Sequence, residues 1–215
     1  MRKIILSGLV AAVLPASAAL SQDLYVYGGA ALEFELAPNG AGSDNKTDIN
    51  AYVEVEKSGF FAGLWAEKSS DELSDKADVY VGYRAQTAGG LSYYVDLTRR
   101  TYFNDTGDYT VVDAGVEYQF TEQFSTSFDL FYYPDYPLID AYVGAAFALS
   151  DKITVSANYG TYGVEDAPDQ QEWDFGAGYA IGEESAFDLR YYNGTEYVDH
   201  YFGASLSWDT TFLSR

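Results

Sequence analysis

Acidic side chains recur at every second residue along several segments of the chain. In VVDAGVEYQF, residues 111–120, Asp113 and Glu117 alternate with apolar neighbours, so the acids lie on one face of a strand and the apolar residues on the other. Carboxylates that face water without a basic partner attract cations and repel anions. The residues that we predict to contact cations are Asp113, Glu117, Asp129, Asp140, Glu54 and Glu56.

Three arginines fall on the same face as these acids. The short connections TAGG and GEES each join segments that would pair as antiparallel strands, and the pairing brings each arginine near an aspartate. Opposite charges across two strands contribute about 0.2–1 kcal/mol. Such pairs could line a wet pore or only satisfy charges in a filled interior. The predicted ion pairs are Asp78–Arg100, Arg84–Asp96 and Asp174–Arg190.

The elements that would position these residues are strands. No stretch shows a convincing 3.6-residue period, whereas a two-residue period recurs almost everywhere. We expect about twelve strands, over residues 23–37, 48–57, 60–68, 76–87, 90–104, 109–121, 123–133, 138–150, 152–164, 171–181, 185–193 and 199–212.

The connections between these segments alternate in length. APNGAGSDNK and EKSSDELSDK are long and polar, whereas KSG, TAGG and SDK are tight. An up-and-down antiparallel transmembrane β-barrel has this pattern, with short periplasmic turns and longer outer loops. A Greek-key sandwich has no reason to alternate its loops so regularly.

The apolar faces carry aromatic residues at or near both ends. In one segment the series is Phe202, Ala204, Leu206 and Trp208. Aromatic girdles on both sides of an apolar band are typical of a membrane barrel, although a soluble protein also buries aromatic rings. The opposite face carries tyrosines as well as acids, and about twelve strands predict a narrow or partly blocked lumen.

The start of the chain has the layout of a secretory signal peptide. Arg2 and Lys3 precede an apolar run and then small residues, so we expect a signal over residues 1–21 and a single barrel domain over 22–215. No other segment holds about 18 uninterrupted apolar residues. If the chain crosses a membrane, we therefore expect it to do so with its alternating strands and not with helices.

Composition excludes several classes of function. The formal net charge is −21, which argues against a nucleic-acid partner. Cysteine is absent and His200 is the single histidine, so histidine-rich metal sites are absent. No nucleophile stands beside His200 along the chain. We predict no enzymatic activity and no cofactor.

Several segments resemble a proteobacterial family of uncharacterised exported, outer-membrane-like proteins, often labelled Gcw_chp. The similarity runs over residues 58–182 and includes SGFFAGLWAEK, GLSYYVDLTRRTYF and WDFGAGYAIG. It implies an outer-membrane-like β protein and supplies no catalytic residues.

Together these features predict an outer-membrane β-barrel that forms a narrow, porin-like channel with cation preference. Its partners would be outer-membrane lipid and small cations or small polar solutes. Two alternatives stay open: a structural or surface-binding barrel with a closed lumen, and a soluble periplasmic β-sandwich or barrel.

Overall fold

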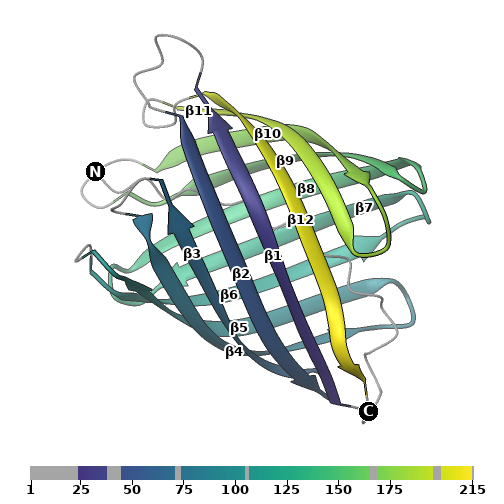
Figure 1. Ribbon diagram of the computed structural model, residues 1–215, viewed down its shortest axis with the longest axis horizontal. Coiled ribbons are helices and arrows are strands. Elements are labelled where there is room, and N and C mark those ends of the chain that lie inside the picture. Colours follow the sequence, from purple (N-terminus) through teal and green to yellow (C-terminus); the bar gives the residue numbers. More distant parts are fainter. Residues whose placement is uncertain are drawn as a thin grey trace.

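The computed structural model describes residues 24–37, 45–70, 74–104, 107–164, 169–195 and 200–214. In this part of the chain twelve antiparallel strands close into one barrel (Figure 1). The predicted signal peptide, 1–21, lies outside the described residues. The described residues contain no helix that is long and apolar enough to cross a membrane.

The strands follow one another around the barrel in chain order, and β1 pairs with β12 to close it. Their bounds are β1 Leu24–Leu36, β2 Lys46–Lys57, β3 Phe60–Ser69, β4 Lys76–Gln86, β5 Leu91–Tyr102, β6 Tyr109–Gln119, β7 Phe124–Tyr133, β8 Leu138–Ser150, β9 Ile153–Tyr162, β10 Gln170–Ala180, β11 Ser185–Gly194 and β12 Tyr201–Ser214. The predicted twelve-stranded, up-and-down topology is confirmed.

Strand boundaries differ from the predicted ones by a few residues. β2 begins at Lys46 rather than at residue 48, because Lys46 still pairs with Glu35 of β1. The β2–β3 hairpin turns through Ser58 and Gly59, whose φ angles are +54° and +84°. Two successive residues with positive φ are what a two-residue hairpin loop requires.

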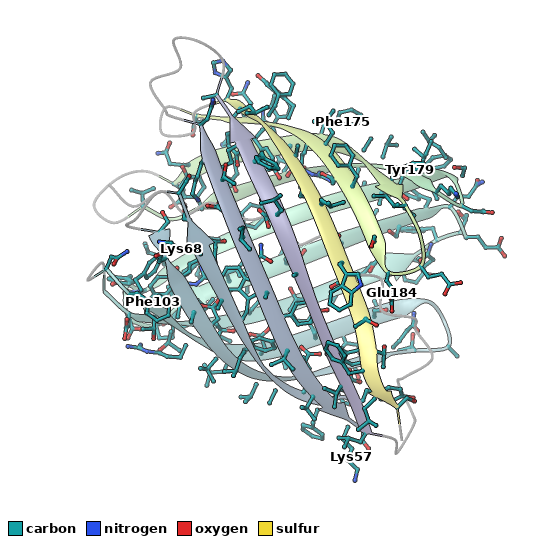
Figure 2. The ribbon with its side chains drawn as sticks, viewed as in Figure 1. Lys57, Lys68, Phe103, Phe175, Tyr179 and Glu184 are labelled. Atoms are coloured by element: carbon teal, nitrogen blue, oxygen red, sulfur yellow. The ribbon has the colours of Figure 1, made fainter. Side chains whose placement is uncertain are left out.

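The apolar faces point away from the barrel rather than into a core. Phe60, Phe175 and Phe212 are 67%, 55% and 61% exposed, whereas the acids alternate with such residues and face inward. Figure 2 shows Phe175 and Tyr179 projecting from the outside of the wall. A soluble sandwich would bury these rings against a second sheet, so that alternative is wrong for this chain.

Because successive strands are antiparallel, the described strand ends that flank the long connections share one end of the barrel, and the tight turns share the other. We call these the loop end and the turn end. Tyr25 pairs with Ser214, so the first and last described strands begin and finish at the turn end.

Candidate functional site

The inward face of the barrel is the candidate site, and it is strongly acidic. In the described strands its carboxylates are those of Glu33, Glu35, Asp48, Glu54, Glu56, Glu67, Asp78, Asp96, Asp113, Glu117, Asp129, Asp140, Glu172, Asp174, Asp188 and Asp209. Its basic residues are Lys46, Lys76, Arg84, Arg100 and Arg190. The acids exceed the bases about three to one, so the bases cannot pair with all of them.

The structure brings Asp78 and Arg100 together as the strand register predicted. Arg100 Nη2 lies 2.6 Å from Asp78 Oδ2, and Arg100 Nε lies 2.9 Å from Asp78 Oδ1. Arg100 Nη1 also donates to the hydroxyl of Tyr109 at 3.2 Å. This two-pronged contact joins β4 to β5 at the loop end.

Replacing Arg100 with glutamine is expected to lower the free energy of unfolding by about 1–3 kcal/mol, because Asp78, which is 7% exposed, then keeps a buried charge without its partner. Urea unfolding of the refolded protein measures the loss. The double variant Arg100→Gln/Asp78→Asn removes both charges and should recover part of it. An unchanged unfolding midpoint in Arg100→Gln would refute a structural role for this pair.

Arg190 contacts Asp174 from the diagonal position expected across the β10–β11 hairpin. Its Nε also lies 3.3 Å from Asp188 Oδ1, and its Nη2 donates to Ser156 Oγ at 2.7 Å. The side chain reaches Ser156 because Gly176 of the intervening strand leaves room for it. Arg190 therefore holds two carboxylates instead of the single one predicted.

Arg84 is not paired with Asp96, contrary to the prediction. Its guanidinium instead reaches across β3 to Glu54 and to Glu56, whose Oε2 lies 2.9 Å from Arg84 Nε. It lies 4.3 Å from the centre of the Phe61 ring. Adjacent-strand register could not reveal a contact that skips a strand. Glu54 and Glu56, two of the predicted cation contacts, therefore each have an arginine partner that the register did not reveal.

Asp140, another of the predicted cation contacts, has both carboxylate oxygens bonded within the protein. It is fully buried, at 0% exposure. Its Oδ2 accepts from the Tyr133 hydroxyl at 2.8 Å, and its Oδ1 accepts from the Gly163 backbone N–H at 2.9 Å. Both oxygens of Asp140 are bonded and the residue has no exposed surface. Asp140 of β8 therefore holds the backbone that follows β9 at the loop end.

Asp113 and Asp129 have different surroundings from Asp140. Together with Asp96 they form a group that we call the mid-strand acidic cluster. Asp96 and Asp113 are directly opposed on β5 and β6. The Tyr94 hydroxyl lies 3.1 Å from Asp113 Oδ1 and 2.9 Å from Asp129 Oδ1. All three acids are partly exposed, and no basic side chain of the described residues forms an ion pair with them.

Glu117 continues the acidic face of β6 toward the turn end. Its neighbours across the sheet are Ser92 and Ser127, so small polar side chains flank it, and it has no ion-pair partner in the described strands. Of the six predicted cation contacts, Asp113, Asp129 and Glu117 thus keep the environment that cation contact requires.

Inward glycines allow the large lumen side chains to lie flat along the wall. Tyr94 is directly opposite Gly115 and passes over it to reach Asp129. Tyr52 likewise covers Gly29, and its hydroxyl meets Asp209 Oδ1 of β12 at 2.8 Å. The same direct opposition occurs in the pairs Phe61–Gly82, Tyr80–Gly63 and Tyr142–Gly160.

Replacing Gly115 with valine is expected to push the Tyr94 ring off the wall, because a Cβ there would overlap Tyr94 Cε1 and Asp129 Oδ1. Overpacking of this kind costs about 1–3 kcal/mol, and the displaced ring should lower single-channel conductance. Gly178→Val is the matched control, since its Cβ would meet only Asp188 Oδ2, at 3.6 Å. Equal conductance and stability in the two variants would contradict this packing.

The lumen is unevenly filled. At the loop end of β5–β8, Tyr109, Val111 and Tyr133 form a buried cluster inside the barrel. At the turn end of β7–β12, the inward residues are small: Ser125, Ser127, Gly144, Ala146, Ala148, Ser156, Gly176, Gly178, Ala186, Ser205 and Ser207. Large side chains therefore fill the loop end of β5–β8, whereas small side chains line the turn end of β7–β12.

Comparison with known proteins supports the fold and assigns no family. No family model matches the chain, and no curated protein matches it. The KdgM porin superposes with a TM-score of 0.67 at 7% identity, over 85% of this chain and 98% of that one. The NanC porin gives 0.62 at 8% identity, over 86% and 100%. An outer membrane channel from Pseudomonas putida F1 gives 0.52 at 11% identity, over 93% and 100%. The chain therefore has the barrel fold of these porins and channels.

Proposed function

We propose that this protein is an outer-membrane barrel that acts as a narrow passive channel with a preference for cations. The observation that carries the proposal is the pairing of an apolar outer face with an inward face on which carboxylates greatly outnumber bases. A wet ring of unpaired acids favours cations. The long connections would face the cell exterior and the tight turns the periplasm.

The structural neighbours support a channel, but the ligand of one of them would not suit the lumen of this protein. One structure of the KdgM porin is of a complex with oligogalacturonate, a chain of acidic sugars. Excess negative charge in the lumen would repel such a polyanion. We therefore propose small cations and small polar solutes as the permeant species here.

A barrel with a closed lumen is the second candidate, and the packed tyrosines at the loop end favour it. Tyr109 and Tyr133 are 5% and 7% exposed, so that part of the interior is filled. In this case the arginine–carboxylate pairs would serve stability alone, and the exposed loops would carry any binding.

Three measurements test the proposal. Cell fractionation and heat-dependent gel migration should place the protein in the outer membrane as a folded barrel. Planar-bilayer recordings of the purified protein should show discrete conductance steps. Recovery in the soluble periplasmic fraction would overturn the location, and a folded, inserted protein that conducts no current would favour the closed barrel.

A further inference from the structure

Cation–π contacts recur on the inward face of the barrel, where ammonium and guanidinium groups of the chain lie over aromatic rings. Measured to the ring centre, they join Arg84 to Phe61 at 4.3 Å, Lys76 to Trp65 at 5.4 Å and Arg100 to Tyr109 at 5.8 Å. Each of these cations also bonds carboxylates, which are respectively Glu54 with Glu56, Glu67, and Asp78. Ring faces and carboxylates attract the same kind of cation, so three inward rings beside acids each hold one.

A fourth group of inward rings and acids lies at the loop end of β10–β12. Tyr192 of β11 and Tyr201 of β12 are directly opposed, and their rings stack with centres 4.5 Å apart and planes 13° from parallel. We call this pair the tyrosine stack. Asp174 of β10 is directly opposite Tyr192, and Tyr201 lies within electrostatic range of Glu172. All four residues are partly exposed, so rings and carboxylates border the lumen together.

Glycines on both sides of Glu172 leave its carboxylate within reach of the rings. Glu172 is directly opposite Gly160 of β9 and Gly194 of β11. The ring of Tyr142 lies flat over Gly160, and no side chain at Gly194 stands between Glu172 and the tyrosine stack. Diagonal neighbours of this kind, such as Glu172 and Tyr192, are about 7–8 Å apart. One small cation can span that separation, because an ammonium group is attracted to a ring from within about 6 Å of its centre.

The bases of the chain do not serve this group. Arg190 is the one base on the inward face of the described strands β8–β12, and its donors go to Asp174, Asp188 and Ser156. In the part of the chain that the structure describes, no lysine or arginine lies over the tyrosine stack, and Glu172 forms no ion pair. The same chemistry that holds Arg84 or Lys76 elsewhere in the lumen therefore faces the solute here.

We infer that the tyrosine stack and Glu172 form a binding site for a small organic cation that carries a methylated ammonium group. Such a group presents positive charge through apolar, weakly hydrated methyl groups, which is what aromatic rings recognise. The carboxylate of Glu172 supplies the opposite charge. The inference rests on the proposed cation preference of the lumen and narrows it to a class of solute that ring faces favour over K⁺.

The test is calorimetric titration of the folded, full-length mature protein in detergent with tetramethylammonium chloride, with KCl as the reference at equal ionic strength. Tetramethylammonium should bind about tenfold more tightly than K⁺, and Tyr192→Leu/Tyr201→Leu should weaken its binding by about tenfold. Tyr192→Phe/Tyr201→Phe keeps both ring faces and should bind as the unaltered protein does. Glu172→Gln keeps the rings, removes the charge and should also weaken binding.

Tyr25→Leu is the matched control for the loss of a stacked inward ring. Tyr25 stacks with Tyr27, with centres 5.8 Å apart and planes 2° from parallel, and it is directly opposite Glu56. Arg84 already bonds Glu56, so the rings there have a cation of the chain as their neighbour. This variant should bind tetramethylammonium as the unaltered protein does.

Four results would overturn the inference. They are no binding by the unaltered protein, equal binding by the leucine variant, a phenylalanine variant as weak as the leucine variant, and K⁺ binding as tight as that of tetramethylammonium. Heat-dependent gel migration checks that each variant is folded, and if the leucine variant is not, the phenylalanine variant and Glu172→Gln decide. Because no current is measured, a barrel that binds without conducting would keep this site and lose the proposed channel, whereas a cation-selective channel that does not bind would lose only the site.

Discussion

Arginine in place of Val81 is expected to be the most damaging single substitution on the outside of the barrel. Val81 lies in the middle of β4, points outward and is 51% exposed. At the middle of a bilayer an outward arginine costs about 2–4 kcal/mol. Urea unfolding from lipid vesicles should show the loss as a lower unfolding midpoint, and less of the protein should insert.

Ser205→Arg is the matched control for this prediction, because it introduces the same charge in the middle of a strand but on the inward face. Ser205 is opposite Asp188 on one side and Glu33 on the other, so a guanidinium there would find carboxylates and water. Its cost should stay below about 1 kcal/mol. A larger loss for Ser205→Arg than for Val81→Arg would mean that the wet and apolar faces are assigned the wrong way round.

Neutralising the mid-strand acidic cluster is expected to have the largest effect on ion selectivity. The triple variant Asp96→Asn/Asp113→Asn/Asp129→Asn removes three partly exposed carboxylates, none of which forms an ion pair within the described residues. The ratio of cation to anion permeability should fall towards unity, because the local excess of negative charge is what distinguishes the ions. The Tyr94 hydroxyl can still donate to an asparagine oxygen, so the barrel should remain folded.

Asp140→Asn provides the contrast within the same lumen. Asp140 is fully buried and bonded to Tyr133 and to the backbone of Gly163, so its charge is screened from the pore by packed rings. This variant should leave selectivity unchanged while it lowers stability by about 1–3 kcal/mol. A selectivity change as large as that of the triple variant would contradict the division of the acids into buried and pore-facing groups.

Much of the fold could be read from the sequence because a strand with two unlike faces imposes a period of two. The alternation around Asp113 placed this acid on the opposite face of the strand from its apolar neighbours, and the tight turns fixed the register of neighbouring strands. Pairs between neighbours, such as Asp78 with Arg100, follow from that register alone.

Contacts that skip a strand could not be predicted in this way. Arg84 bypasses Asp96 because a route over β3 to Glu54 and Glu56 is open. For Tyr94 and Arg190 the signal that was missed is the inward glycine, because Gly115 and Gly176 each lie under the side chain that reaches past them to the next strand. An inward glycine opposite an aromatic or basic residue therefore marks where a side chain can lie along the wall.

The reversal potential of single channels in a salt gradient tests the central claim most directly. Purified protein in a planar bilayer, with concentrated KCl on one side and dilute KCl on the other, should give a reversal potential shifted toward the equilibrium potential of K⁺. That shift follows from the excess of carboxylates over bases in the lumen. A reversal potential at zero, or one shifted toward the equilibrium potential of Cl⁻, would contradict it.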